Sequence, residues 1–272
     1  MLRTEMRNEK STHIDKMETI DMVKIMNAEN MNSVLAVEKA LPSVAKAIDA
    51  IAAAMEKGGR LRYIGAGTSG RLGIIDASEC PPTFGVPHEL VQGIIAGGPE
   101  RVFKAGENEE DNYDKGVDAV KDMLKENDVL VGISAAGGAK FILGALETAK
   151  QIGCTTVCIT SNEGTAVTKV ADIPIVCDTG AEVITGSTRL KAGNSQKFVL
   201  NMLSTCAMIK TGKVYENLMI NLKPSNEKLR LRVIRITSQI LDIPEEAAIP
   251  LLEKHNWDIR ETVESVDPDI TK

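Results

Sequence analysis

Residues 63–73 read Tyr63-Ile64-Gly65-Ala66-Gly67-Thr68-Ser69-Gly70-Arg71-Leu72-Gly73, and this stretch decides the fold. An apolar run leads into a glycine-rich turn, and a helix is expected to follow the turn. Gly65, Gly67 and Gly70 fit the pattern GxGxxG, in which small residues let a phosphate group approach the first amides of a helix. The stretch therefore predicts a strand–loop–helix unit that binds an anion.

The glycine loop favours a small phosphorylated ligand over a dinucleotide. A dinucleotide-binding fold needs an acidic residue at the end of its second strand, whereas Glu89 precedes the second apolar run. The adjacent hydroxyls of Thr68 and Ser69 can bind phosphate oxygens beside the amides of Gly67 and Gly70. A tight turn that holds no ligand remains an alternative.

Short apolar runs alternate with helical segments from residue 60 onward. The expected strands are 61–65, 90–96, 129–134, 155–160 and 173–177, and the expected helices are about 70–77, 114–125, 139–152, 165–170 and 187–210. Strands that are apolar throughout and alternate with helices indicate a parallel sheet covered on both faces. We expect an α/β fold with a doubly wound, five-stranded parallel sheet in the flavodoxin-like order 2-1-3-4-5.

Two helical regions flank the predicted sheet domain. Residues 1–58 are expected to be helical and to pack on it; the clearest helix runs from Pro42, in its first turn, to Lys57. Residues 59–222 form the sheet domain in this division. Residues 223–272 are expected to form a small module of short helices.

Composition and charge exclude several classes of protein. Of the 272 residues 43% are hydrophobic and 26% charged, which suits a folded chain with a real core. A net charge of −6 and only 3% aromatic residues argue against nucleic acid as a partner. The longest uncharged runs, 151–162 and 198–209, are shorter than the ~18 residues that would suggest a membrane span.

Cysteine usage and the N-terminus point to the cytoplasm. The five cysteines are scattered and include no CxxC pair, which is typical of reduced thiols. None of the three histidines lies near a cysteine pair, so we expect no metal site. The charged N-terminus has no apolar stretch behind it, so no signal peptide is expected.

Two further loops carry hydroxyl groups that could join the glycine loop. Ser134 follows the third strand, and strands 1 and 3 of the predicted order are neighbours where the winding reverses, so their loops flank a ligand crevice. Ser187 and Thr188 precede Lys191 at the start of the long helix. This last cluster is either a helix cap with solvated charges or a further wall of the site.

Carboxylates are the natural candidates for acid–base chemistry, because the chain has few histidines. Glu79 is expected at the end of the helix that starts at the glycine loop, where the helix dipole disfavours its ionised form. Glu110 lies in the acidic run 107–111, which is either a solvated loop or part of the site. Spacing alone does not show that the two meet.

Residues 63–73, 76–83, 94–99 and 180–191 closely resemble the N-acetylmuramic acid 6-phosphate etherases. This family belongs to the sugar isomerase (SIS) fold group and is related to glucokinase regulatory protein. The similarity spans nearly the whole chain, and the last helices look like the ubiquitin-associated-type module at the end of such enzymes.

The resemblance implies a lyase of amino sugar catabolism and peptidoglycan recycling that needs no cofactor. It implies cleavage of the D-lactyl ether of N-acetylmuramic acid 6-phosphate to N-acetylglucosamine 6-phosphate and D-lactate, by elimination and then hydration. Glu79 would be the acid at the ether oxygen and Glu110 the base at the neighbouring carbon. Thr68 and Ser69 would help to hold the sugar phosphate, and the family analogy implies a homodimer.

One loop departs from the family pattern. After the third strand the family usually reads Ala/Ser-Ala-Ser-Gly-Arg-Thr-Pro, where this chain has Ala136, Gly138, Ala139 and Lys140 in place of serine, arginine, threonine and proline. Backbone amides can still bind an anion there. A non-catalytic sugar-phosphate-sensing regulator and a phosphosugar isomerase are therefore the alternative readings, and a nucleotide-dependent oxidoreductase is the least favoured.

Overall fold

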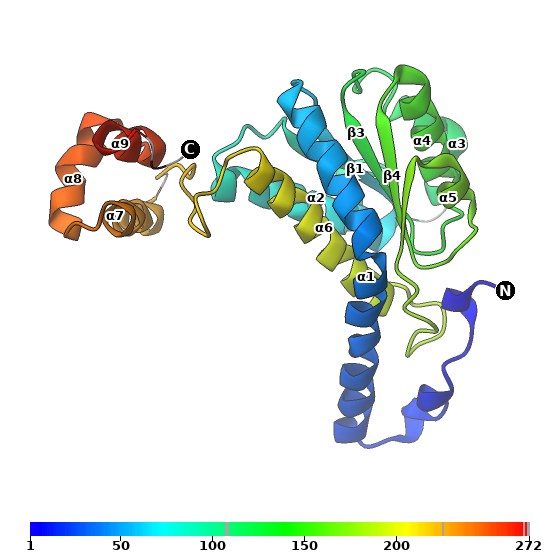
Figure 1. The fold of residues 1–272 in the computed structure, drawn as a ribbon. Coiled ribbons are helices and arrows are strands. Elements are labelled where there is room, and N and C mark those ends of the chain that lie inside the picture. Colours follow the sequence, from blue (N-terminus) through cyan, green and yellow to red (C-terminus); the bar gives the residue numbers. More distant parts are fainter. Residues whose placement is uncertain (107–108, 225, 269, 271–272) are drawn as a thin grey trace. The chain divides into compact units, whose positions relative to one another are not determined.

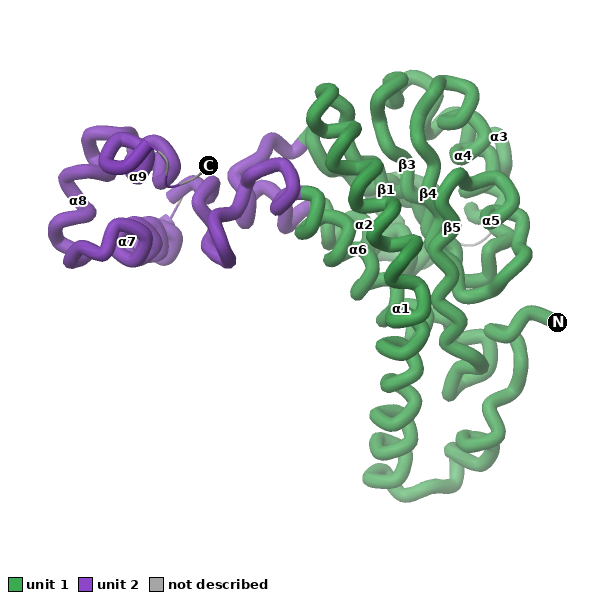
Figure 2. Tube along the Cα trace, in the orientation of Figure 1, with its two compact units in different colours: residues 1–77, 89–207 green, residues 78–88, 208–272 purple. Residues whose placement is uncertain are grey.

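The computed structural model describes residues 1–106, 109–224, 226–268 and 270 of the chain. The chain forms two compact units (Figure 2): unit 1 contains residues 1–77 and 89–207, and unit 2 contains residues 78–88 and 208–272. The three-part division of the chain at residues 58 and 222 stays a prediction. Within the described residues, no helix is both long and apolar enough to cross a membrane.

A five-stranded parallel sheet forms the centre of unit 1 (Figure 1). The strands are β1 (Leu61–Gly65), β2 (Val91–Ile95), β3 (Val129–Ile133), β4 (Thr155–Thr160) and β5 (Ile173–Val176). Their order is β2-β1-β3-β4-β5, which confirms the doubly wound order predicted from the alternating apolar runs. β1 and β4 match their predicted bounds, and the other three strands are one or two residues shorter than predicted.

Helices cover both faces of the sheet, as its apolar strands require. The helices of unit 1 are α1 (Thr19–Glu56), the first part of α2 (Gly67–Phe84), α3 (Tyr113–Asp118), α4 (Lys140–Ile152), α5 (Ala166–Val170) and α6 (Lys191–Lys210). Short 3₁₀ helices lie at Arg3–Glu5, Glu9–Ser11, Ile14–Lys16, Pro99–Val102 and Glu109–Asp111. Helices α3, α4 and α5 lie on one side of the sheet in Figure 1, and α1 and α6 on the other.

The core of unit 1 follows the two-residue period of the strands. On the α4 face, Ile64 and Leu130 are buried in one cluster with Ile142 and Leu146 of that helix. On the opposite face, Gly73 of α2 lies against Tyr63, since a Cβ on this glycine would be 2.9 Å from the Cβ of Tyr63.

Helix α1 is much longer than predicted. It begins at Thr19, so Pro42 lies inside the helix and not in its first turn. A proline inside a helix lacks one amide donor and costs about 3 kcal/mol. The buried positions of α1 continue on both sides of the proline, at Ser33, Ala36, Val37, Ala40, Val44, Ala47, Ile48, Ile51 and Ala52. Packing of this stripe therefore outweighs the local cost.

Three other helices differ from their predicted bounds. α2 was expected over 70–77, but it starts at Gly67 and continues through Pro81 and Pro82 to Phe84. The amide of Gly85 donates to the Pro81 carbonyl at 2.9 Å and extends the hydrogen bonding past the prolines. α3 ends at Asp118, well before residue 125, and the long last helix of unit 1 starts four residues later than expected.

The C-terminal part of unit 2 is a small helical bundle, as predicted. It comprises α7 (Glu227–Leu241), α8 (Glu245–Lys254) and α9 (Ile259–Val266). Their buried core contains Val233, Ile234, Ile236, Ala248, Leu252, Ile259 and Val263. The Arg230 guanidinium lies 4.0 Å from the ring centroid of Trp257, so the only tryptophan of the chain is stacked on a cation.

Candidate active site

The glycine loop joins β1 directly to α2. Gly65 ends the strand, and Gly67 begins the helix with a φ of +52°, in the region that favours glycine. A Cβ on Gly70 would lie 2.6 Å from the Gly65 carbonyl oxygen, so this close approach also requires glycine. The first turn of α2, with the hydroxyls of Thr68 and Ser69, therefore starts at the carboxyl edge of the sheet, where its amides suit an anion.

The start of α6 packs against the glycine loop. Thr68 Cγ2 and the Thr188 carbonyl oxygen lie 3.7 and 3.6 Å from the position that a Cβ on Gly193 would take. Ser69 Oγ is 3.0 Å from Oε1 of Gln196, to which it donates a hydrogen bond. The fold thus brings the hydroxyl pair Thr68 and Ser69 together with the cluster of Ser187 and Thr188.

The loop after β3 leaves the sheet beside the glycine loop. Ser134 follows Ile133, which is the register partner of Gly65 on the neighbouring β1. The buried Ser134 Oγ accepts a hydrogen bond from the amide of Gly137 at 3.1 Å, which closes the loop on itself. Because the hydroxyl is only an acceptor in this bond, its own proton remains available to a ligand.

A cavity of about 410 Å³ lies between the glycine loop and the segment that follows β2. Its lining includes Gly67, Arg71, Arg101 and Glu110. Glu110 is exposed, in the 3₁₀ helix Glu109–Asp111, and within the described part of the chain it forms no hydrogen bond or ion pair. Residues 107 and 108 of the predicted acidic run lie outside the described residues.

The neighbouring carboxylate, Glu109, is held by cations. Its oxygens lie 3.0 Å from Lys115 Nζ and 3.5 Å from Arg101 Nη2. The hydrogen bond from Lys115, helped by the charge of Arg101, lowers the pKa of Glu109. Glu110 is therefore the carboxylate of this run that is available to a ligand in the cavity.

Glu79 occupies a different environment from the one predicted. It was expected at the end of a helix, but α2 continues five residues beyond it. Its side chain is exposed, and it belongs to unit 2, whereas the lining of the 410 Å³ cavity described above belongs to unit 1.

Lys191 is held in a buried ion pair. Its Nζ lies 2.5 Å from Oε2 of Glu29 and 2.7 Å from the Ala181 carbonyl oxygen, and the two charged side chains are 2% and 4% exposed. Burial alone would raise the pKa of Glu29, but hydrogen bonds from Lys191, Lys10 and Asn8 hold it at about 2. Ser187 and Thr188, in the turn before this lysine, are partly exposed.

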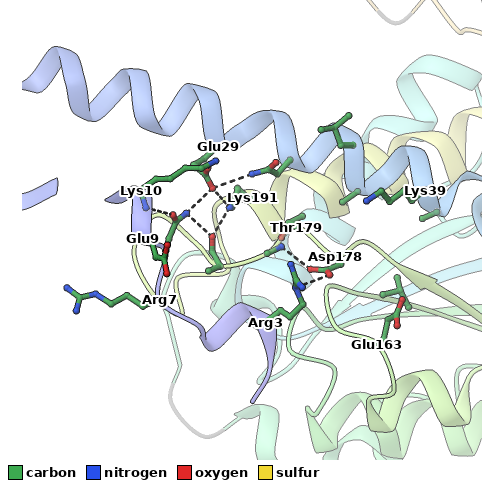
Figure 3. A pocket seen from close by; sticks show the side chains of 18 of the residues that line it. Arg3, Arg7, Glu9, Lys10, Glu29, Lys39, Glu163, Asp178, Thr179 and Lys191 are labelled. Carbon is green, nitrogen blue, oxygen red and sulfur yellow. Dashed lines mark hydrogen bonds and ion pairs between the residues drawn. The ribbon is translucent and has the colours of Figure 1, made fainter. Parts of the chain in front are cut away.

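The same ion pair lines a second, larger cavity of about 780 Å³ (Figure 3). Arg3, Arg7, Lys10 and Lys39 add positive charge to its wall. Arg3 pairs with Asp178 at 3.0 Å. This cavity lies between α1, the N-terminal segment and the loop after β5, and it shares no described lining residue with the cavity at the glycine loop.

Cys158 and Cys177 are buried thiols that are not suited to act as nucleophiles. None of the five cysteines forms a disulfide. Burial raises the pKa of both Cys158 and Cys177 to about 12, so these thiols stay protonated at neutral pH. Among the described residues, no group of three or more histidine, cysteine or acidic side chains is placed to hold a metal ion.

A Clostridium beijerinckii protein named N-acetylmuramic acid 6-phosphate etherase is 53% identical to this chain over 260 residues, which cover 95% of this chain and 86% of the relative. The chain belongs to the N-acetylmuramic acid 6-phosphate etherase family. An etherase of the same name from Symbiobacterium thermophilum is 49% identical over 262 residues, which cover 96% of this chain and 87% of that protein.

Family models and solved structures place the etherase fold in the SIS group. The model of the glucokinase regulatory protein N-terminal SIS domain matches residues 43–150, and the SIS domain model matches residues 110–206. A phosphoheptose isomerase from Francisella tularensis superposes with a TM-score of 0.52 at 19% identity, over 73% of this chain and all of the isomerase. This likeness concerns the fold alone.

The loop expected to depart from the family pattern, residues 134–140, has one position that requires glycine. Gly137 has a φ of +77°, and a Cβ there would lie 2.4 Å from Thr165 Oγ1, so this position requires glycine. No atom lies within 4 Å of a Cβ placed on Gly138. Lys140 is exposed at the first position of α4. Position 138 is thus sterically open at its Cβ.

The sequence reasoning missed three residues that the structure brings to these sites. Gln196 lies beside the etherase glycine loop, while Arg71 and Arg101 line its cavity. Gln196 lies in α6, and its signal was that Gln196 and Lys197 belong to the residues that resemble the etherase family. No sequence pattern predicted that Arg101 lines the cavity, because its position depends on the path of the chain after β2.

Proposed function

We propose that this chain cleaves the D-lactyl ether of N-acetylmuramic acid 6-phosphate, giving N-acetylglucosamine 6-phosphate and D-lactate. The observation that carries this proposal is 53% identity, over 95% of the chain, to a protein named as this etherase. The arrangement of hydroxyl groups, helix amides and a carboxylate around the glycine loop is consistent with a phosphorylated sugar as ligand.

The proposed reaction is an elimination followed by a hydration. In the open-chain sugar, the aldehyde acidifies the proton on carbon 2. A base removes this proton, and an acid protonates the ether oxygen as the bond from carbon 3 to that oxygen breaks and lactate leaves. Water then adds across the new double bond, its oxygen to carbon 3 and a proton to carbon 2. Two carboxyl groups with different pKa values can perform these transfers.

We assign the base to Glu110 and the acid to Glu79. Glu110 lines the cavity beside Gly67 and forms no ion pair within the described residues, so its carboxylate is available to accept a proton. Arg71 and Arg101 line the same cavity, where positive charge would stabilise the enolate that develops on proton removal. The assignment of Glu79 rests on the resemblance of residues 76–83 to the family.

We assign phosphate binding to the glycine loop and the two loops beside it. Gly67, Thr68, Ser69 and Gly70 supply amides and hydroxyls from the first turn of α2, and Ser134 supplies a hydroxyl from the neighbouring loop. Ser187, Thr188 and Lys191 complete the predicted set. The ion pair of Lys191 with Glu29 supports a role in holding the start of α6 against α1.

The decisive experiment is lactate release from N-acetylmuramic acid 6-phosphate in water enriched in oxygen-18. We expect free lactate, with the heavy oxygen at carbon 3 of the sugar. Glu79→Gln and Glu110→Gln should each lower kcat by about 10²- to 10⁴-fold, which is the usual contribution of a general acid or base. Asp111→Asn, an exposed neighbour in the same 3₁₀ helix, is the matched control and should keep its activity.

Other outcomes would contradict the proposal in different ways. Heavy oxygen in the lactate would mean hydrolysis without elimination. Full activity in both glutamine variants would reject the two-carboxylate mechanism. A folded protein that binds the phosphosugar but releases no lactate would instead be a sugar-phosphate-sensing regulator.

We further propose that the chain acts as a homodimer in the cytoplasm. Helices α1 and α6 expose Val34, Leu41 and Phe198, which line an apolar groove of about 710 Å³ together with Cys206. Cysteines without disulfides are typical of a reducing compartment. An apolar face of this kind suits a second copy of the chain around a two-fold axis. Val34→Glu should then shift the mass in solution from dimer to monomer and speed the labelling of Cys206; a monomeric parent protein would refute the dimer.

A further inference from the structure

Only one of the two polar atoms of the Gln196 side-chain amide has a hydrogen-bond partner within the described residues. The residue is 1% exposed, and its Oε1 accepts the hydrogen bond from Ser69 Oγ at 3.0 Å. Its Nε2 is buried and has no hydrogen-bond partner within the described part of the chain. Buried amide donors without a partner are rare in folded proteins, so this group requires an explanation.

The direction of the Ser69 hydrogen bond conflicts with a role in phosphate binding. A phosphate dianion only accepts hydrogen bonds, and a serine hydroxyl has one proton to give. When Ser69 donates this proton to Gln196, the same hydroxyl has no proton left for the phosphate. Ser69 is partly exposed in the first turn of α2, so its hydroxyl can reach a ligand.

Rotation of the Gln196 amide by 180° about its last bond changes the direction of this hydrogen bond, while Oε1 takes the buried position that has no partner within the described residues. The rotation exchanges Oε1 and Nε2, which have nearly the same shape. Nε2 would then donate to Ser69 Oγ and would no longer be without a partner. The Ser69 proton would be released and could point at the phosphate.

We propose that Gln196 is a positioning residue that donates to Ser69 Oγ and so directs the Ser69 hydroxyl proton to the phosphate of the substrate. The proposal rests on the proposed function, both for the identity of the sugar and for the binding of its phosphate at the glycine loop. It predicts that a side chain able only to accept at position 196 holds the Ser69 proton away from the ligand.

Gln196→Glu is the direct test, because a carboxylate has the size of the amide but only accepts. We expect it to weaken binding of N-acetylglucosamine 6-phosphate by about ten- to a hundredfold, the usual effect of losing a hydrogen bond to a charged group. Titration calorimetry measures the Kd, and inorganic phosphate serves as a second probe that does not depend on the sugar. Binding of each probe is measured in the full chain with and without Ser69→Ala.

The Ser69→Ala background distinguishes two explanations of weaker binding in Gln196→Glu. One is the changed direction of the hydrogen bond to Ser69, and the other is charge repulsion between the new carboxylate and the phosphate. Repulsion between the new carboxylate and the phosphate does not need Ser69, so it would weaken binding equally in both backgrounds. The proposal requires a smaller effect of Gln196→Glu when Ser69 is already alanine. Equal effects in the two backgrounds, or an unchanged Kd, would overturn it.

Gln196→Met keeps the test usable if the buried carboxylate prevents folding. Methionine preserves the length of the side chain but removes both donor and acceptor. We expect KM to rise by several-fold while kcat stays the same, because the phosphate is remote from the bond that breaks. An equal fall in kcat with unchanged KM would contradict a role at the phosphate. If wild-type protein binds phosphate but releases no lactate, the proposed function fails while the role of Gln196 can still be measured.

Discussion

Glu29→Gln should destabilise unit 1 strongly, because it leaves the buried Lys191 charge without its ion-pair partner. The two side chains are 4% and 2% exposed, and their charged atoms are 2.5 Å apart. Removing one partner of a buried ion pair typically costs 3–5 kcal/mol. The second ion pair of Glu29, with Lys10 at 2.9 Å, adds little because that lysine is 73% exposed. We therefore expect a loss of about 3–5 kcal/mol in the free energy of unfolding.

Urea denaturation followed by far-ultraviolet circular dichroism measures this loss by linear extrapolation. Lys191→Met is the matched variant, since it removes the charge but keeps an unbranched side chain. The double variant removes both charges of this pair. Its loss in the free energy of unfolding should therefore be well below the sum of the two single losses. A loss below about 1 kcal/mol for Glu29→Gln, or additive losses in the double variant, would refute the reasoning.

The pH dependence offers an independent check on the same pair. The pKa of Glu29 is about 2 in the folded protein, against its ordinary value of 4.5. A depressed carboxyl pKa stabilises the fold above pH 4.5, and this stabilisation disappears as the pH falls from 4.5 to about 2. The difference corresponds to roughly 3 kcal/mol. The stability gap between wild type and Glu29→Gln should therefore shrink across this window, and a gap that stays constant down to pH 2 would contradict it.

Three further predictions concern other parts of the chain. Gly138→Arg should tighten phosphosugar binding by about tenfold, because the position is sterically open and a guanidinium binds phosphate well; calorimetry would reject this if the Kd is unchanged. Gly137→Ala, its neighbour and control, should instead lower the melting temperature, because its φ is +77° and Thr165 blocks a Cβ; an unchanged melting temperature would count against this reading. Arg230→Ala should change the fluorescence of Trp257 in unit 2 and cost at most about 1 kcal/mol, and an unaltered emission spectrum would argue against the stacking.

The sheet was predictable because its strands are apolar on both faces. β1 and β4 match their predicted bounds, and the strand order followed from the alternation of strands and helices. Helix ends were less predictable, because prolines were read as local signals. Pro42, Pro81 and Pro82 all lie inside helices. Tertiary packing decides these positions, and a single sequence does not display it.

The candidate site was predictable where residues adjoin a strand end, and not elsewhere. Thr68 and Ser134 follow neighbouring strands, so the sheet order alone brought their loops to one edge. Lys191 was predicted as a phosphate ligand, but the residue that binds it in the structure, Glu29, lies 162 positions away in the sequence. No local pattern connects two such positions.

The N-terminal segment has a consequence for how the chain is made. The amide of Arg3 donates to Asn162 across 159 positions, and Asn8 donates to the Ala181 carbonyl across 173. Contacts so distant in sequence form late, because a long loop must close first. During synthesis on the ribosome, Arg3 therefore lacks Asn162, and Asn8 lacks Ala181, until most of unit 1 has been translated. The segment around Arg3 and Asn8 therefore completes its long-range contacts late, and until then it must stay out of contact with other nascent chains.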